Sequence, residues 1–256
     1  MRNRFLSFAL FVCGTTVLFW CAGPVASSSA DEPSPAKPTA ESQKAPDSQK
    51  QEKPSPYAWR NLFDGKTLKG WKAPEFGGEG KVEVKDGMIV MHYGNPMTGI
   101  VYTGKDFPKN NYEFEYEASR LDGSDFFATV TFPVGDEFCS FVNGGWGGTT
   151  IGISSVDFYD ASDNITTGFF DFKDKQWYKF RVRVSDAKVE VWIGKEKVVD
   201  LVRKGHQFST RFEVDLCKPF GFSTWMTTGA IRSVRVRMLK PEEVKDIALE
   251  AKEHPF

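Results

Sequence analysis

Two short stretches decide the fold, YEFEYEA at residues 112–118 and YKFRVRV at residues 178–184. Apolar side chains occupy every second position of both, with glutamates between them in the first stretch and basic residues in the second. This period of two is typical of a β-strand that buries one face, because successive side chains point to opposite sides. Residues 188–193 and 234–238 repeat the pattern. The alternation predicts an antiparallel sheet with one solvated face that carries cross-strand ion pairs.

Turn signals separate these segments and complete the prediction of an all-β fold. Asp86-Gly87 lies between residues 81–84 and 88–91, and Gly194-Lys195 follows Trp192. Such pairs are typical of tight hairpins. Helical spacing appears only in the tail, residues 241–256, where an acidic first turn precedes apolar side chains and predicts a short C-terminal helix. A two-sheet antiparallel β-sandwich is therefore expected, and a propeller or β-helix is not, because no fixed repeat is visible.

Overall charge excludes one class of partner. The 256 residues carry 33 Lys and Arg against 34 Asp and Glu, without a basic cluster. A nucleic-acid-binding protein normally carries a basic surplus or stripe. We therefore expect no nucleic-acid partner, and the sequence leaves the oligomeric state open.

The N-terminal region divides into two segments before the domain. Residues 1–30 have the layout of a secretory signal peptide, with two arginines, an apolar run and a small-residue end. We expect cleavage after Ala30, the alternative being an uncleaved membrane anchor, although the run falls short of the about 20 apolar residues of a span. No other stretch could cross a bilayer, so the mature chain is expected to be secreted or periplasmic. Residues 31–56, rich in proline and without aromatics, are predicted to be a disordered linker, which leaves residues 57–240 for one globular domain.

Two cysteines, Cys139 and Cys217, remain after signal cleavage. In an oxidising compartment they could form one disulfide. Both also lie among aromatic residues, and a free cysteine packs well as a small apolar side chain. Sequence leaves the two alternatives open.

One predicted sheet face is neutral instead of charged, and it suggests a ligand. If Phe126 and Ala128 face the core, Asp125 and Phe127 lie on the opposite side, and the same argument places Ser223 and Trp225 there. Hydroxyls, an acid and exposed aromatic rings suit a sugar, whose C–H faces stack on rings while its hydroxyls form hydrogen bonds. The alternative is that these aromatic residues simply pack under a loop.

A glycine-rich segment, NGGWGG at residues 143–148, forms a second candidate cluster. Glycines let the backbone approach a ligand closely, and Trp146 between them is free to lie against a sugar ring. No Lys-Ser/Thr follows, so a phosphate-binding loop is excluded. Asp157, Asp160 and Asp163 could offer oxygen ligands to calcium, but they lack the spacing of an EF-hand loop. The alternative is that these acids simply stabilise turns in a polar loop. We therefore assign no metal or cofactor.

Other catalytic patterns are weak. The domain holds His92 and His206 but no G-x-S-x-G elbow, which argues against a serine triad. Five acidic residues could supply a pair of catalytic carboxylates, but their spacing in the sequence does not give the distance between the carboxyl groups. These residues are Asp125, Glu137, Asp157, Asp160 and Glu213.

The opening of the domain, LFDGKTLKGW at residues 62–71, resembles the signature of the 3-keto-disaccharide hydrolase domain family. Further similar segments follow in order up to residue 236: KDGMI at 85–89, VYT at 101–103, NYEF at 111–114, KQWY at 175–178 and IRSVRV at 231–236. The resemblance implies a concanavalin A-like jelly-roll sandwich and an extracytoplasmic role on carbohydrates. The chain departs from the family at residues 123–127 and 149–153, where a family glutamate has no evident counterpart.

If the resemblance extends to activity, a ketone at C3 of the sugar acidifies the C2 proton, and a base and an acid remove the C1 substituent. We assign Asp157 and Asp160 as base or metal ligand and His92 as partner acid. Sugar contacts are expected from five residues: Trp146, Trp225, Asp125, Phe127 and Ser223. The competing hypothesis is a non-catalytic carbohydrate-binding module, and a weaker one is an interaction domain without a sugar ligand. Two carboxyl groups within about 10 Å of each other beside Trp146 or Trp225 would favour the enzyme.

Overall fold

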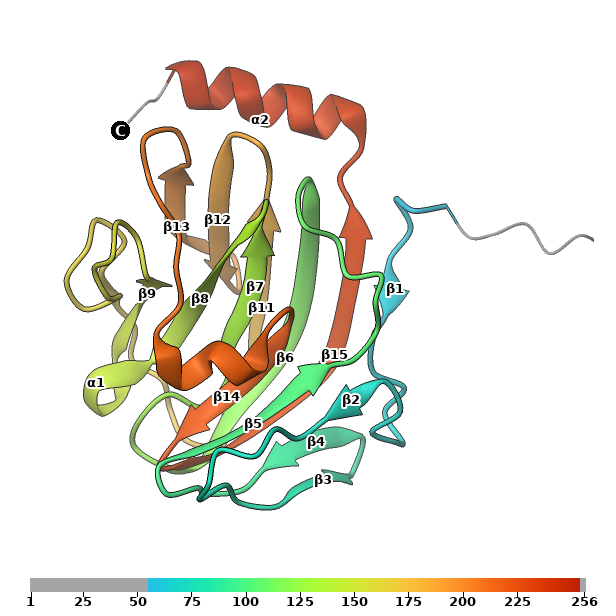
Figure 1. The fold of residues 1–256 in the computed structure, drawn as a ribbon, viewed down its shortest axis with the longest axis vertical. Coiled ribbons are helices and arrows are strands. Elements are labelled where there is room, and N and C mark those ends of the chain that lie inside the picture. The colour runs from blue at the N-terminus through green and yellow to red at the C-terminus, as the bar shows by residue number, and fades with distance from the viewer. Residues whose placement is uncertain (1–54, 254–256) are drawn as a thin grey trace, which may run out of the picture. The chain divides into compact units, whose positions relative to one another are not determined.

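The computed structural model describes residues 55–253, which form a β-sandwich closed by a C-terminal helix (Figure 1). The predicted signal peptide and the predicted linker up to residue 54 lie outside the described residues. All described strand pairs are antiparallel, as the period of two predicted. Between residues 55 and 253, no helix has the length and apolarity needed to cross a membrane.

Sheet I carries the alternating charged segments. Its order is β13 (Glu196–Val202), β12 (Lys188–Ile193), β11 (Tyr178–Val184), β6 (Tyr112–Gly123), β15 (Thr227–Met238), β4 (Met88–Met91) and β3 (Val82–Lys85), with β1 (Arg60–Asn61) paired to β15. The predicted turns are confirmed: Asp86 and Gly87 link β3 to β4 with φ of 50° and 77°, and Gly194 opens the turn between β12 and β13 with φ of 62°.

Sheet II carries the neutral segments and lies against sheet I. Its order is β10 (Gly168–Phe169), β9 (Thr150–Ser154), β8 (Glu137–Gly144), β7 (Thr129–Val134), β14 (Gly221–Trp225), β5 (Met97–Tyr102) and β2 (Trp71–Lys72). A single turn labelled α1 (Gly145–Gly148) joins β8 to β9, and a 3-10 helix, η1 (Phe212–Cys217), precedes β14. The sequence did not predict η1, because no helical spacing marks it.

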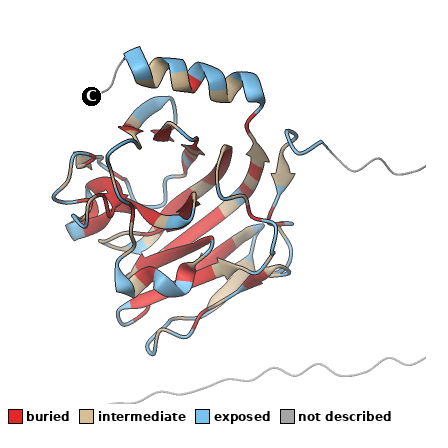
Figure 2. Ribbon diagram, turned by 45° about the horizontal axis from the view of Figure 1, so that its top comes forward, coloured by how far each residue is buried: buried red, intermediate tan, exposed pale blue. Residues whose placement is uncertain are grey.

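The core is aromatic and fills the space between the sheets. Tyr116 of β6 stacks on Phe180 of β11 with ring centroids 4.8 Å apart, and it meets Phe222 of the opposite sheet edge-on at 4.9 Å. All three side chains are fully buried. Figure 2 shows this burial as red bands along the strands, whereas exposed residues concentrate in the loops and on the helix. The buried aromatic pairs therefore hold the two sheets together.

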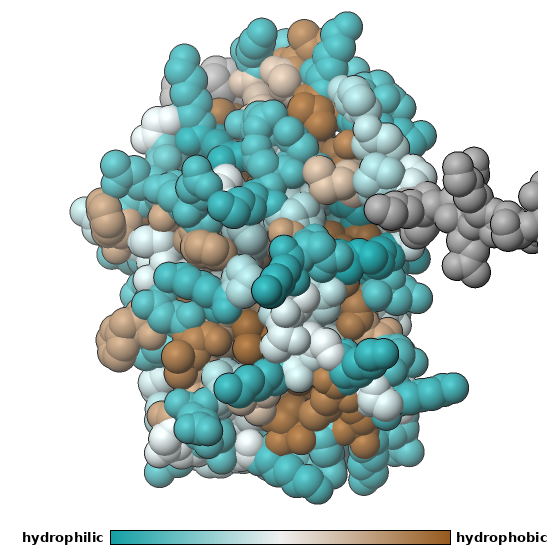
Figure 3. Space-filling view, turned by 45° about the vertical axis from the view of Figure 1, so that its right-hand side comes forward, coloured by the Kyte–Doolittle hydropathy of each residue, from teal (hydrophilic) through white to brown (hydrophobic). Residues whose placement is uncertain are grey.

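The outer face of sheet I carries the expected ion pairs. Three glutamates of β6 each bind an arginine of the neighbouring β15: Glu113 with Arg237, Glu115 with Arg235 and Glu117 with Arg232. Tryptophan rings cover all three arginines: the Trp177 centroid lies 4.0 Å from Cζ of Arg232, and the Trp59 centroid lies 4.5 and 5.4 Å from Cζ of Arg235 and Arg237. In the view of Figure 3, hydrophilic residues dominate the surface and apolar residues form separate patches. The charges on this face are thus mutually satisfied.

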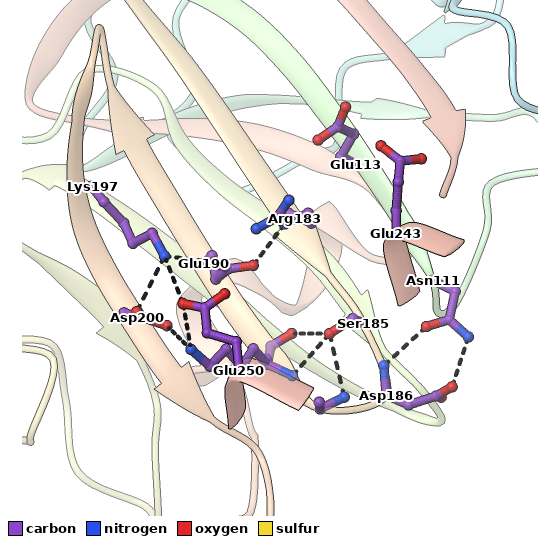
Figure 4. Close-up of polar contacts among 12 residues, drawn as sticks. Asn111, Glu113, Arg183, Ser185, Asp186, Glu190, Lys197, Asp200, Glu243 and Glu250 are labelled. Carbon is purple, nitrogen blue, oxygen red and sulfur yellow. Dashed lines mark hydrogen bonds and ion pairs between the residues drawn. The ribbon is translucent and has the colours of Figure 1, made fainter. Parts of the chain in front are cut away.

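The predicted C-terminal helix is α2 (Pro241–Glu253), and charged contacts attach it to sheet I (Figure 4). Glu243 binds Arg237 at 2.7 Å, and Glu250 lies 3.1 Å from the Nζ atom of Lys188, which is only 2% exposed. Lys188 also binds Asp200 at 2.9 Å. Ile247 of α2 is buried beside this network. Glu243 and Glu250 of the helix therefore form ion pairs with Arg237 and Lys188 of sheet I.

Cys139 and Cys217 are free and buried, so of the two alternatives, a disulfide or two separate thiols, the structure has the separate thiols. Cys139 belongs to the core between the sheets, whereas the Sγ atom of Cys217 lies 3.7 Å from the carbonyl oxygen of Phe222. Burial raises the pKa of Cys217 to about 12 and also raises that of Cys139.

Candidate functional site

The neutral face predicted from sequence is the outer face of sheet II, but most of it is covered. Four hydroxyl residues lie on it with at most 2% exposure: Thr129, Thr131, Ser140 and Ser223. The η1 helix packs against β14 and β5 on this sheet and contributes the buried Val214 and Cys217. At the end of β14, Trp225 is half-buried and lines a pocket.

This pocket at the end of β14 has a volume of about 250 Å³. Side chains from β8, α1, β9, β14 and the segments beside them meet there. The lining residues are Asp125, Phe126, Val142, Trp146, Ser154, Arg211, Glu213 and Trp225. We call this the aromatic pocket. It combines large rings with a small number of charged groups, which is the usual composition of a small-molecule site.

Two tryptophans give the aromatic pocket its walls. Trp225 ends β14 and tilts against Phe126, with ring centroids 6.2 Å apart. Trp146 is 47% exposed and lies in the glycine-rich segment with φ of 49° and ψ of 50°, a left-handed conformation that is unfavourable for a residue with a side chain. Such backbone conformations concentrate at binding and active sites. The fold therefore holds Trp146 out at the surface at a cost in conformational energy.

Asp125 connects the two aromatic walls through backbone hydrogen bonds. Its Oδ1 atom accepts from the amide of Phe126 at 2.7 Å, and its Oδ2 atom accepts from the amide of Gly147 at 3.1 Å. One carboxylate thus ties the residue that packs on Trp225 to the turn that presents Trp146. Both oxygens of Asp125 are engaged in positioning the pocket.

The charged centre of the pocket is Arg211, bound on two sides. Its Nη1 atom lies 2.5 Å from Asp160, and its Nη2 and Nε atoms lie 2.7 and 3.1 Å from the two oxygens of Glu213. The hydrogen bond from Arg211 lowers the pKa of Glu213, and the same bond is the main cause that raises the pKa of Arg211. Because one guanidinium binds both carboxylates, these lie within about 10 Å of each other beside the tryptophans.

Of the predicted sugar contacts, the structure brings Asp125, Trp146 and Trp225 together in the aromatic pocket. The prediction for Phe127 was wrong: it is fully buried in the core and packs edge-on against Phe172 at 5.0 Å. Strand β7 begins only at Thr129, so the alternation that placed Phe127 outward does not extend to it. Phe126 takes the outward position instead.

Ser223 lies on the predicted face but is not accessible. It is fully buried, and its Oγ atom has no hydrogen-bond partner among the described residues. As placed, Ser223 does not reach a ligand in the aromatic pocket, because the lining of that pocket does not include it. The sequence pattern identified its face correctly but gave no sign of the covering helix.

The three residues assigned to catalysis belong to separate clusters. Asp157 binds the Nδ1 atom of His206 at 2.6 Å, Asp160 binds Arg211, and His92 binds Glu83 at 2.9 Å. His92 follows the buried Met91 of β4 and so points to the outer face of sheet I. Only Asp160 approaches the aromatic pocket, through Arg211.

The aspartates considered for calcium also separate. Asp157 points to His206 and Asp160 to Arg211, so these carboxylates do not converge on one point. Within residues 55–253, one group of three acids lies close enough to hold an ion, Glu190, Asp200 and Glu250. Lys197 lies within 3.6 Å of all three, which makes this group part of the network that attaches α2.

Sequence reasoning missed Phe126 and Arg211, and it named Glu213 only among possible carboxylates. Arg211 precedes η1 and Glu213 lies in its first turn, and within residues 203–219 no period in the sequence indicates which side chains face the pocket. The family glutamate that seemed to lack a counterpart around residues 149–153 has a spatial alternative: Glu213 lines the same pocket as Ser154 at the end of β9.

The two antiparallel sheets and the short terminal helix define an all-β sandwich fold. Residues 58–237 match the 3-keto-alpha-glucoside-1,2-lyase-like domain, and the chain belongs to this family. The resemblance noted from LFDGKTLKGW is thereby confirmed.

Solved structures resemble this chain at low sequence identity. The Crh5 transglycosylase in complex with NAG has a TM-score of 0.50 at 13% identity, over 72% of this chain and 84% of that one. A putative glycosyl hydrolase from Parabacteroides distasonis gives 0.45 at 17% identity, over 71% and 94% of the two chains. The carbohydrate-binding module CBM66 from Bacillus subtilis gives 0.40 at 9%, over 66% and 95%. No match was found among curated proteins.

Proposed function

We propose that the chain is an exported enzyme that cleaves the C1 glycosidic bond of 3-keto glycosides in the aromatic pocket. The observation that carries this proposal is the meeting of two tryptophans with an arginine and its paired carboxylates in one pocket. The family to which the chain belongs is described as a 3-keto-alpha-glucoside-1,2-lyase-like domain, and this description supports the same chemistry. Export rests on the layout of residues 1–30.

Binding in the aromatic pocket uses its rings and its size. Trp146 and Trp225 offer apolar faces for the C–H surface of a sugar, while the charged groups offer partners for its hydroxyls. A volume of about 250 Å³ lies just below the range of about 300–1,000 Å³ of ligand pockets in general. The pocket thus fits one sugar ring, the one that carries the ketone.

The reaction follows from the acidity that a C3 ketone gives to the C2 hydrogen. We assign Glu213 as the base that takes the C2 proton, while the C1–O bond breaks and a C1–C2 double bond forms. The departing oxygen takes a proton from the carboxyl group or from water in the open pocket. Water then adds its hydroxyl to C1 and a proton to C2, which completes hydrolysis. Arg211 next to Glu213 stabilises the negative charge that develops on the C3 oxygen.

Charge in the pocket suits these roles. The lowered pKa of Glu213 keeps it ionised at neutral pH, ready to accept a proton, although it makes Glu213 a weak base. The activating ketone compensates for that weakness. Asp160 holds Arg211 from the side opposite Glu213, so it acts by positioning and not as the base expected from sequence. Asp157 and His92 receive no role in this chemistry, because neither lines the aromatic pocket.

The second candidate function is a non-catalytic carbohydrate-binding module. One feature favours it: the charged groups already have partners. Asp160 and Glu213 both bind Arg211, and Asp125 accepts hydrogen bonds from two backbone amides. A site of this kind can hold a sugar without a free acid or base. Turnover therefore decides between the two functions.

The test uses the mature chain with paired 3-keto and ordinary glycosides, followed by binding titration and product analysis. Glu213→Gln should lower turnover by about 10²-fold or more while binding persists, as loss of a general base does. Glu242→Gln, an exposed carboxylate on α2, is the matched control and should behave as wild type. Binding without turnover by wild type would establish the module instead, and neither binding nor turnover would refute both functions.

A further inference from the structure

Exposed apolar side chains gather beside the aromatic pocket. Among residues 55–253, four of the largest exposed ones fall within the segment 155–169, which leads from β9 to β10 (left in Figure 1). They are Phe158 (77% exposed), Tyr159 (59%), Ile165 (70%) and Phe169 (76%). Trp146 on α1 and Phe212 on η1 are also exposed. Concentrated exposed apolar residues of this kind indicate a binding surface.

The same segment forms a hollow of about 550 Å³. It is lined by Val156, Asp157, Tyr159, Ser162, Asp163, Asn164, Ile165 and Thr167. Tyr159 offers a ring face and a hydroxyl, and the exposed Ser162 and Asp163 offer further polar atoms. Among the hydrogen bonds of the described residues, the side chains of these three have no partner. The hollow thus combines an aromatic ring with unused polar groups, which suits a sugar.

Hydrogen bonds fix the shape of the hollow. The Nδ2 atom of Asn164 donates to the carbonyl oxygens of Ile153, Tyr159 and Asp160 at 2.7 to 2.9 Å. Opposite, His206 and the amide of Gln207 bind the carboxylate of Asp157. A ligand entering the hollow therefore meets a loop that is already ordered, which reduces the entropic cost of binding.

The hollow adjoins the aromatic pocket through Asp160. The carboxylate of Asp160 binds Arg211 and lies 3.2 Å from Ser154, both of which line the aromatic pocket. Its carbonyl oxygen accepts a hydrogen bond from Asn164, which lines the hollow. Asp160 thus contacts residues that line each cavity, which places the two cavities next to each other in the fold.

We propose that this hollow is a second saccharide subsite, so that the substrate is an oligosaccharide with one unit in the aromatic pocket and a further unit against Tyr159. The inference rests on the proposed function of the aromatic pocket and extends it to the size of the substrate. The ring of Tyr159 takes the apolar face of the second sugar, and Ser162 and Asp163 bind its hydroxyls. Because the contacts lie away from the reacting carbon, they govern affinity for long substrates and not the chemistry.

The experiment measures binding of glucose and of glucose oligosaccharides of two to six units, α-linked and β-linked, to the mature chain. Wild type should bind the oligosaccharides of the series it recognises at least tenfold more tightly than glucose. Tyr159→Ala and, independently, Asp163→Ala should remove this gain while affinity for glucose stays unchanged. Tyr93→Ala is the matched control, because Tyr93 is a similarly exposed tyrosine that follows β4 of sheet I.

Two results would overturn the subsite and leave the proposed function standing: equal affinity of wild type for short and long members, or retention of the gain in both variants. Absence of binding by every member, with no turnover of 3-keto glycosides, would instead refute the proposed function and the subsite together. A uniform loss of affinity in Tyr159→Ala for all lengths would place Tyr159 in the first site and also overturn the inference.

Discussion

Trp146 offers a test in which sugar binding should be lost while the domain stays folded. The residue is 47% exposed, so about half of its side chain, roughly 100 Å² of apolar area, stays in contact with protein. At about 25 cal/mol per Å², Trp146→Ala should lower the free energy of unfolding by about 2.5 kcal/mol at most. The variant should fold but lose its sugar affinity, because one wall of the aromatic pocket is gone.

Trp146→Gly separates the backbone contribution from the side chain. The left-handed conformation at φ 49° costs any residue with a Cβ atom about 1 kcal/mol or more, and glycine adopts it freely. The glycine variant should therefore be about 1 kcal/mol more stable than the alanine variant, a difference of about 2–4 °C in Tm for a domain of this size. In regular strands and helices the order is reversed.

Urea unfolding, thermal melts and sugar titrations of the two variants provide the readout. Both should lose binding equally, while their stabilities differ in favour of glycine. A glycine variant less stable than the alanine variant would show that the backbone at Trp146 is not left-handed. Wild-type affinity in Trp146→Ala would refute its role as a sugar platform.

Three further predictions concern other parts of the domain. Trp225→Ala should abolish sugar binding at a cost in stability below the about 3–5 kcal/mol of a core truncation, whereas Phe127→Ala should carry that full cost; equal costs in unfolding experiments would contradict the assignment of Phe127 to the core. Arg237 lowers the pKa of Glu243 from 4.5 to about 2, so the stability that Glu243 contributes is present above pH 4.5 and lost toward pH 2. Urea unfolding against pH should show the difference between wild type and Glu243→Gln shrinking over that range, and a constant difference would disprove it. Cys139 and Cys217, buried with raised pKa values, should resist alkylation at pH 8 until the protein is denatured, as mass spectrometry can check.

The architecture could be predicted from sequence because local patterns determine it. Alternation in residues 112–118 and 178–184 reports which face of a strand is buried, and the turns at Asp86 and Gly194 need glycine or a similarly permissive residue. The C-terminal helix followed from its own spacing. Each of these features is encoded within about ten residues, so no knowledge of distant contacts was required.

The site was predictable only where it lies on regular strands or in the glycine-rich turn. Trp225 and Trp146 were found in that way, but Phe127 was misplaced because the strand alternation stops at Thr129. Arg211 immediately precedes η1 and Glu213 lies in it, so their orientation depends on the long-range packing of η1 against β14 and β5. The pairing of Asp160 with Arg211, 51 residues away, is a tertiary contact that no local pattern carries.

Deuterium incorporation tests the central claim most directly. The mature chain is incubated with a 3-keto glycoside in heavy water, and the released sugar is examined for deuterium at C2, with an enzyme-free sample to correct for spontaneous exchange. Removal of the C2 proton by Glu213 followed by addition of water predicts released sugar with one deuterium at C2 for wild type and little release for Glu213→Gln. Release of sugar without deuterium at C2, or undiminished release by Glu213→Gln, would contradict the assignment of Glu213 as the base in the aromatic pocket.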